Sequence, residues 1–371
     1  MIEPAIRDTV NRPTGSRGPF TIAIVCDGIG DVIAGSFISA SRFSERLTAL
    51  GHRVVLISSA SRRSRRQREY QGMTIHRLFG ILVPWSDGQL YLAVPSSERL
   101  RGILQDEQVD VVHVMVPMPL GLVTARIAKA MGLPLVLHSH TQPENIFMNA
   151  TWLPGRRRLT HRFFRYLNWI YAQADMMIYP SDFARRQFPE LADRPNVVIS
   201  NGVDRRRFKP SDPDAFMRRH GLSKSNLNLL YLGRLHREKN VETLIRAMPI
   251  LRRLQPRAHL FVVGIGYEQP LLVDLARRCG AEDSITFCGF VEDGDLAAAY
   301  SACDLFVLPS VAELEGMAVL EAMAAGLPIL ATSVGALREV IHAIVRDAYQ
   351  VWCPVAFEAE GVSAHGCGAE V

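Results

Sequence analysis

The sequence is poor in lysine, in long apolar runs and in paired cysteines, and the last two shortages each exclude a class of protein. Only four of the 42 basic residues are Lys. Nowhere do roughly 18 apolar residues follow one another, as a membrane-spanning helix requires. The first nineteen residues lack the apolar core of a signal peptide. We therefore expect any contact with a membrane to be peripheral.

The six cysteines are scattered along the chain and form no Cys-x-x-Cys pair. No histidines stand near them at the spacing of zinc ligands, so neither a metal site nor a disulfide framework is indicated. We expect Cys26, Cys279, Cys288 and Cys303 to be small core residues, and Cys353 and Cys367 to be exposed, in a protein of the reducing cytoplasm. The cysteines are Cys26, Cys279, Cys288, Cys303, Cys353 and Cys367.

The composition is that of a folded chain with a modest excess of positive charge. Of its 371 residues 48% are hydrophobic, and the formal charge is +5 with a pI near 9.0. This length is long for a single core, so two domains are expected. The charge is compatible with an anionic substrate or an anionic membrane surface. No nucleic-acid-binding signature accompanies the basic runs, so no nucleic-acid partner is expected.

Apolar runs alternate with segments of helical period in both halves of the chain. Such runs are typical of parallel strands buried on both faces by helices. The predicted strands are residues 21–26, 53–58, 74–78, 111–115, 134–138 and 176–179, then 228–233, 259–264, 284–288, 305–308 and 328–332. The predicted helices are residues 37–50, 98–105, 120–131 and 158–172, then 241–254, 269–278, 296–302 and 316–324.

This rhythm predicts an α/β fold of two doubly wound, Rossmann-like domains facing a central cleft, with ligands at the carboxyl ends of the strands. A Pro- and Arg-rich stretch, residues 193–213, interrupts the rhythm and is interpreted as the hinge between the domains. We expect a disordered extension over residues 1–19, a first domain over 20–195, a second over 196–343 and an atypical tail over 344–371.

Dinucleotide chemistry is disfavoured although glycines follow two of the strands. After Gly28-Ile29-Gly30 and after Gly264-Ile265-Gly266, the third small residue of the Rossmann fingerprint is missing. A Walker loop is absent as well. A tight turn at the strand end accounts for each glycine pair.

The most informative stretch is residues 309–327, PSVAELEGMAVLEAMAAGL. It places Glu313 in a loop after an apolar strand and Glu321 inside the following helix, whose first turn near Gly316 offers N–H groups to an anion. Upstream, Arg234 and Lys239 follow the first strand of the second half. Two cations and a helix N-terminus can neutralise a departing diphosphate without a metal. The alternative is a loop acid, a solvated helix acid and ordinary surface cations.

Several motifs in this order resemble the retaining family-4 glycosyltransferases of GT-B fold. They are NGVD (201–204), GRLHREKN (233–240), VVGIGYE (262–268), ITFCGFV (285–291) and ELEGMAVLEAMAAGLP (313–328). The segments GSFISASRFSERLTALGHRVVLIS, DVVHVMVPMPLG and LVLHSHTQPENI are similar to the acceptor-domain motifs of that family. The resemblance spans residues 20–340.

The resemblance implies transfer of a sugar from a nucleotide-diphosphate donor, with no metal or other cofactor. By analogy Glu313 contacts the sugar hydroxyls, Glu321 the ribose, and Arg234 with Lys239 the diphosphate. Further implied contacts are the backbone N–H groups of Gly316 and Met317, the loop near Gly35, His140 beside the reacting sugar, and Glu144. For His140 an ordinary strand-end histidine, and for Glu144 a loop cap, remain alternatives.

The acceptor implied is a lipid or a glycan. Arg156–Arg158 lead into a basic, aromatic-rich segment (159–173), and Arg62, Arg63, Arg65, Arg66 and Arg68 add charge, which suits peripheral contact with an anionic membrane at its cytoplasmic face. A helix packed on the sheet is the alternative.

The end of the chain departs from the family. After Glu321 the family has further closing helices, whereas the tail here shows no period, so we expect truncation or a frameshift, a mobile region beyond Ala343 and low activity. Two other functions remain open: a catalytically impaired remnant that binds nucleotide, and a nucleotide-sugar epimerase of the same fold.

Overall fold

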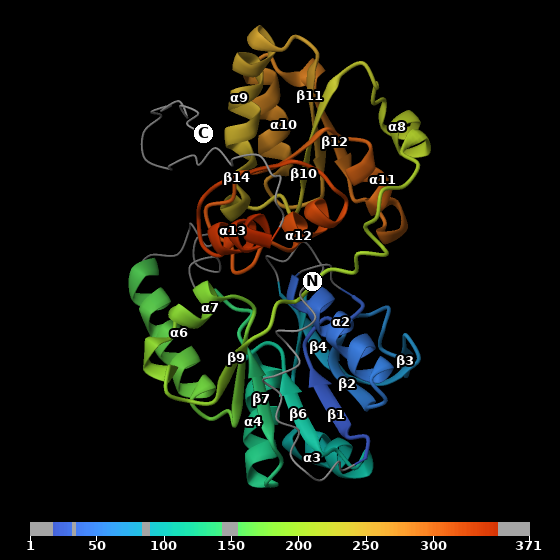
Figure 1. Cartoon of the computed structure of the whole chain (residues 1–371). Coiled ribbons are helices and arrows are strands. Elements are labelled where there is room, and N and C mark those ends of the chain that lie inside the picture. Colours follow the sequence, from blue (N-terminus) through green and yellow to red (C-terminus); the bar gives the residue numbers. More distant parts are fainter. Residues whose placement is uncertain (1–17, 32–34, 84–89, 143–154, 348–371) are drawn as a thin grey trace. The chain divides into compact units, whose positions relative to one another are not determined.

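The computed structural model describes residues 18–31, 35–83, 90–142 and 155–347 (Figure 1). The chain divides into two compact units. The first is residues 1–138 with 173–176, and the second is residues 139–172 with 177–371. The predicted extension 1–17 and the tail 348–371 lie outside the described residues.

The larger sheet has the strand order β3-β4-β2-β1-β6-β7-β8-β9, with β5 pairing with β4. β1 lies parallel between β2 and β6, and its residues are almost all buried, as expected of a strand covered on both faces. β3 and β5 are antiparallel to β4. The strands are β1 (Thr21–Val25), β2 (Arg53–Ala60), β3 (Glu69–Tyr70), β4 (Met73–Leu82), β5 (Tyr91–Ala93), β6 (Val111–Val114), β7 (Leu135–His138), β8 (Met176–Tyr179) and β9 (Asn196–Val198).

Local sequence signals mark the starts of helices that accompany these strands. The side chain of Ser96 accepts the N–H of Arg99 and caps one helix, and Pro119 opens another, where its missing N–H costs nothing. The helices are α2 (Gly35–Ala49), α3 (Ser97–Asp106), α4 (Pro119–Ala130), α6 (Arg156–Tyr171) and α7 (Asp182–Arg186).

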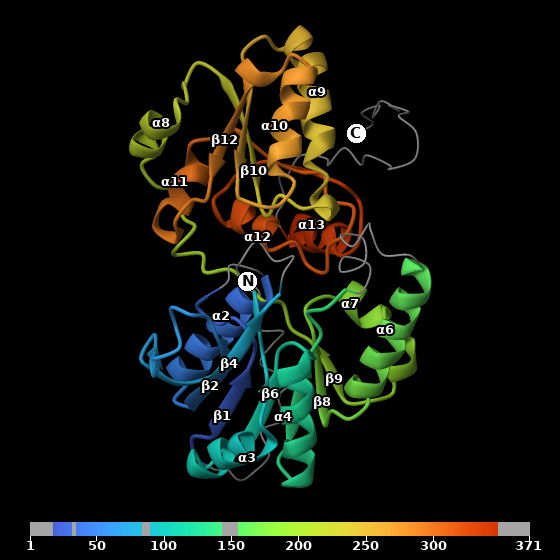
Figure 2. The ribbon, with the colours of Figure 1, turned by 180° about the vertical axis from the view of Figure 1, so that it is seen from behind.

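The second sheet is parallel and has the strand order β12-β11-β10-β13-β14. Helices α9 and α10 run side by side along it in both views (Figures 1 and 2). The strands are β10 (Leu227–Leu232), β11 (Ala258–Val263), β12 (Ile285–Gly289), β13 (Leu305–Leu308) and β14 (Ile329–Ala331). The helices are α8 (Asp214–His220), α9 (Val241–Leu254), α10 (Gln269–Arg278), α11 (Leu296–Ser301), α12 (Met317–Ala324) and α13 (Leu337–Asp347).

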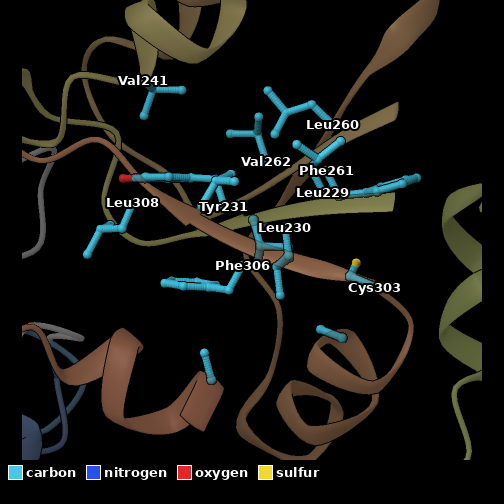
Figure 3. Close-up of a cluster of buried hydrophobic side chains, with 14 of the residues drawn as sticks. Leu229, Leu230, Tyr231, Val241, Leu260, Phe261, Val262, Cys303, Phe306 and Leu308 are labelled. Atoms are coloured by element: carbon cyan, nitrogen blue, oxygen red, sulfur yellow. The ribbon is translucent and has the colours of Figure 1, made fainter. Parts of the chain in front are cut away.

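The core of the second unit forms around the three central strands (Figure 3). Leu230, Phe261 and Phe306 are fully buried on neighbouring strands. Cys303 lies at the edge of this cluster, as a small apolar residue would, and burial raises the pKa of its thiol. The four cysteines within the described residues are free thiols.

The predicted α/β fold with parallel sheets is confirmed, and most predicted strands and helices agree with the structure to within a few residues. Six described α-helices and β-strands were missed: β3, β5, α7, β9, α8 and α13. The stretch interpreted as a hinge, residues 193–213, contains β9, which pairs in parallel with β8. Helix α13 continues to Asp347, so the helical period extends past the predicted boundary at residue 343.

The basic, aromatic-rich helix is α6, and its apolar side chains lie mainly inward. Leu167, Ile170 and Tyr171 are fully buried, and the Phe164 ring contacts Phe188. Trp169 is 47% exposed. This arrangement favours the alternative of a packed helix over a membrane-binding apolar face.

Candidate active site

The carboxyl ends of three neighbouring strands bring the predicted donor-binding residues together. β10 lies between β11 and β13, and all three run in the same direction. Their following loops are residues 233–240, 264–268 and 309–316. In open α/β sheets, ligands bind at this edge.

Two of these loops approach so closely that only glycine fits. Gly264 has φ +134°, and a Cβ there would lie 1.9 Å from the carbonyl oxygen of Gly233. A Cβ at Gly266 would lie 2.3 Å from the carbonyl oxygen of Leu235. The N–H of Leu235 donates to the carbonyl of Ile265 at 2.9 Å. The second glycine pair therefore serves loop packing next to the cations, in agreement with the tight-turn interpretation.

Lys239 and Glu313 form a direct ion pair. Lys239 Nζ lies 2.5 Å from Glu313 Oε1, and the side chains are only 16% and 11% exposed. Ser310 Oγ donates to the same carboxylate oxygen at 2.9 Å. The sequence predicted separate partners for these two groups, the diphosphate for one and the sugar for the other. In this structure, each satisfies the other's charge.

Arg234 is the more accessible of the two predicted cations. Its side chain is 47% exposed, and its Nη2 lies 3.3 Å from Oε1 of the buried Glu238. The hydroxyl of buried Tyr231 donates to the carbonyl of Arg234 at 2.8 Å and so holds the backbone of Arg234 in place. Burial raises the pKa of Tyr231, so this phenol stays neutral.

The loop of residues 313–316 is held by close backbone packing. The N–H of Ala336 donates to the carbonyl of Glu313 at 3.0 Å, and a Cβ at Gly335 would lie 2.2 Å from that oxygen. Gly316 takes φ +84° and precedes α12 without a side-chain cap. The first turn of α12 begins at Met317, four residues after Glu313.

Glu321 lies on the buried face of α12. It is 7% exposed, and Tyr300, itself buried, donates its hydroxyl to Glu321 Oε2 at 3.2 Å. Glu313 is 8% exposed. The alternative of a solvated helix acid is therefore excluded for Glu321, because carboxylates are seldom buried to this degree without a specific partner.

Sequence reasoning missed Glu315, the most heavily bonded acid of this loop. It is 4% exposed, and its carboxylate accepts the N–H of Asn201 at 2.9 Å, Asn201 Nδ2 at 2.5 Å and Ser200 Oγ at 2.5 Å. Ser181 Oγ donates to the neighbouring carbonyl of Leu314 at 2.5 Å. No local spacing signals these bonds, because the partners lie more than a hundred positions upstream.

The remaining predicted site residues lie elsewhere in the chain. Gly35 is the first residue of α2 in the first unit, and His140 is the second residue after β7 and belongs to the second unit. Glu144 lies outside the described residues. The roles assigned to these three residues stay predictions.

The arrangement suits an anionic ligand. Two cations stand on one loop, and an uncapped helix N-terminus stands on the next. Within the described ranges no group of three His, Cys, Asp or Glu side chains is placed to hold a metal ion. In the same part of the chain, no helix combines the length and apolar character needed to cross a membrane.

Two family descriptions cover most of the chain. Residues 33–207 match Glycosyltransferase Family 4, and residues 212–353 match Glycosyl transferases group 1. The chain belongs to these glycosyltransferases. This confirms the resemblance read from the motifs, and the second match includes Arg234, Lys239, Glu313 and Glu321.

Similar proteins and solved structures support the same assignment to the glycosyltransferases. The chain is 39% identical to an uncharacterized glycosyltransferase of Methanocaldococcus jannaschii over 39% of this chain and 38% of the relative. It is 28% identical to a GDP-mannose-dependent alpha-mannosyltransferase of Mycobacterium tuberculosis over 86% of this chain and 81% of that one. Anabaena HepE in complex with UDP and glucose superposes with TM-score 0.66 at 20% identity, covering 86% of this chain and 82% of that one. The predicted GT-B fold is thereby confirmed.

Proposed function

We propose that this glycosyltransferase moves a hexose from a nucleotide-diphosphate sugar to a lipid or glycan acceptor and retains the anomeric configuration. The observation that carries the proposal is the largely buried Lys239–Glu313 pair between two adjoining strand-end loops. At this edge of the sheet, Lys239 and Glu313 can each exchange the other for a group of a ligand that carries both anionic oxygens and hydrogen-bond donors. A sugar diphosphate offers hydroxyl donors and anionic oxygens together.

Binding of the donor would separate Lys239 from Glu313. The diphosphate takes Lys239 and the accessible Arg234, while the Glu313 carboxylate turns to the sugar hydroxyls. Glu321 would receive the ribose hydroxyls beside Tyr300. Charge-assisted hydrogen bonds of this kind are the strong ones, and the N–H groups at the start of α12 add to them.

Retention of the anomeric configuration without a protein nucleophile implies that the acceptor attacks from the same face of the sugar from which the leaving group departs. The bond between the anomeric carbon and the diphosphate oxygen breaks, the acceptor oxygen bonds on the same face, and the acceptor proton passes to the leaving diphosphate. Lys239 and Arg234 stabilise the charge that develops on that diphosphate. No metal is needed in this scheme.

The proposal is tested with a panel of UDP-, GDP- and ADP-sugars. GDP-mannose and UDP-glucose come first, because one relative is GDP-mannose-dependent and HepE was solved with UDP and glucose. Nucleoside-diphosphate release, product linkage by NMR and thermal shift are measured together. An α-linked product from an α-linked donor supports the proposal. Binding without release would indicate the impaired remnant, and interconversion of free donors would indicate an epimerase.

A further inference from the structure

The ribbon formed by β4 and β5 in the first unit carries a bare apolar face. Phe79 and Ile81 alternate along β4 and therefore share one face. Ile81 pairs with Leu92 of β5, and the N–H of Val94 donates to the carbonyl of Phe79 at 2.8 Å, so Leu92 and Val94 join the same face. Phe79 and Ile81 are each 59% exposed, and Val94 is 51% exposed. We call these four residues the ribbon strip.

The ribbon strip is continuous with a basic turn. Arg77 precedes Phe79 on the same face, and its side chain is fully buried. Its guanidinium donates to the carbonyl of Ser59 at 3.0 Å and to Gln67 Oε1 at 2.5 Å, and it lies 3.5 Å from Asp31. Gln67 belongs to the turn of residues 61–68, so this turn covers Arg77 where the strip begins.

Hydrogen bonds to Asp31 hold the turn of residues 61–68, and the arginine side chains of this turn are exposed. Asp31 accepts the hydroxyls of Ser64 at 2.5 Å and Ser61 at 3.0 Å, and Ser64 is buried. One acid, Glu69, follows directly. Five exposed side chains of one charge therefore stand beside the ribbon strip: Arg62, Arg63, Arg65, Arg66 and Arg68.

A fixed cluster of arginines beside several exposed apolar residues has the chemistry of an interfacial surface. Large exposed apolar residues are ordinary when single, but a contiguous group rimmed by charge marks an interaction site. The apolar side chains suit the boundary between lipid headgroups and acyl chains, and the guanidinium groups suit the headgroup phosphates.

We propose that the ribbon strip and the arginine turn form the surface by which this chain docks on an anionic phospholipid bilayer. The sequence already indicated that these arginines suit an anionic membrane, but it placed the apolar part of the contact on α6, whose apolar residues are mainly buried. The ribbon strip takes the place of α6 in this proposal. Because Asp31 and Arg77 hold the turn through Ser61, Ser64 and Gln67, binding to the membrane does not need to order its backbone. Each arginine near an anionic surface should strengthen binding about fivefold at moderate salt.

The test is sedimentation of the full chain with vesicles of phosphatidylcholine alone or of phosphatidylcholine and phosphatidylglycerol two to one. We expect the wild type to bind the anionic vesicles and to be released by salt. The variants F79S/I81S and R65E/R66E should each weaken binding at least about tenfold with little change in Tm, since all four side chains are exposed.

The matched control is R253E/L254S on α9, because Leu254 is 82% exposed beside an arginine in the second unit. This control should bind as the wild type does. Absence of wild-type binding, equal binding to both vesicles, or equal losses in control and test variants would overturn the proposal. So would F79S/I81S dissociating a dimer while leaving vesicle binding intact. The assay uses no sugar donor, so the proposed transferase function can stand or fall independently.

Discussion

At the scale of single residues, Arg234 offers the sharpest test of the donor site. Its half-exposed guanidinium has Glu238 at 3.3 Å, whereas Lys239 is enclosed with Glu313 at 2.5 Å. Arg234→Ala should weaken binding of the nucleoside diphosphate by about 1.5–3 kcal/mol, the range for a charged hydrogen bond. Calorimetry measures this directly. The control is Arg246→Ala on the exposed face of α9, which should bind the nucleoside diphosphate as the wild type does. If Arg234→Ala also leaves the affinity unchanged, Arg234 does not belong to the donor site.

Asp27 and His113 give the first unit opposing dependences on pH. Burial raises the pKa of Asp27 to about 7, although its carboxylate accepts the N–H of Ala93 at 2.8 Å. Burial lowers the pKa of His113 to about 4. The folded state therefore holds the Asp27 proton that the unfolded state releases between pH 4 and 7, and stability falls as pH rises through that window. His113 acts in the opposite direction, since acidification below its ordinary pKa favours the unfolded state.

The variant Asp27→Asn separates these two effects. At pH 8 the wild type buries a carboxylate, so the neutral amide should stabilise the fold by on the order of 3 kcal/mol. At pH 4 the carboxyl is already protonated in the folded state, and the two proteins should have nearly equal Tm values. Thermal unfolding across this range is the measurement. A variant that is less stable by the same amount at every pH would contradict the assignment of a raised pKa.

At the scale of elements, Glu315 links the loop that carries Glu313 to residues 200–201. Glu315→Ala removes the acceptor for three donors, whereas Glu315→Gln keeps one oxygen and should recover part of the effect. We expect the alanine variant to lower kcat about tenfold or more while nucleoside-diphosphate affinity changes little, because the Glu315 carboxylate is occupied by Ser200 and Asn201 and positions the loop.

The control for this prediction is Glu339→Gln, which breaks the exposed ion pair with Arg186. An exposed pair contributes little, so its kcat should stay near the wild-type value. If Glu315→Ala loses affinity and kcat in equal proportion, or if both variants behave alike, Glu315 is not a positioning residue.

The elements that the sequence predicted well are those with a strong local pattern. β10, β11 and β13 are apolar on both faces, and α9 and α10 have a clear helical period, so the bounds of these five elements were predicted to within one residue. α8 was missed although Pro213 precedes it and Gly221 follows it in the left-handed region, because three prolines nearby suggested a linker. β5 has only three residues and depends on β4 for its existence.

The site itself was only partly predictable. Motif spacing placed Arg234, Lys239 and Glu313 in loops after two strands and Glu321 in the following helix, and those two strands, β10 and β13, are neighbours in the sheet. It could not show that Lys239 and Glu313 pair with each other, or that Glu315 binds residues more than a hundred positions away. Such partners depend on tertiary packing and leave no periodic trace in the sequence.

At the scale of the whole molecule, the account requires that one buried ion pair be exchanged for a sugar diphosphate during each turnover. The measurement that tests this most directly compares wild type and Glu313→Gln for two quantities: nucleoside-diphosphate affinity by calorimetry, and nucleoside-diphosphate release from the donor that the sugar panel identifies. Both quantities are measured on the same protein samples, with Tm as the check of folding.

We predict that Glu313→Gln loses about a hundredfold or more in turnover, as when one group that stabilises a transition state is removed. Its affinity for the free nucleoside diphosphate should stay equal or increase, because Lys239 is released from its ion pair. Wild-type turnover in the variant, or an affinity that falls together with turnover, would contradict the account.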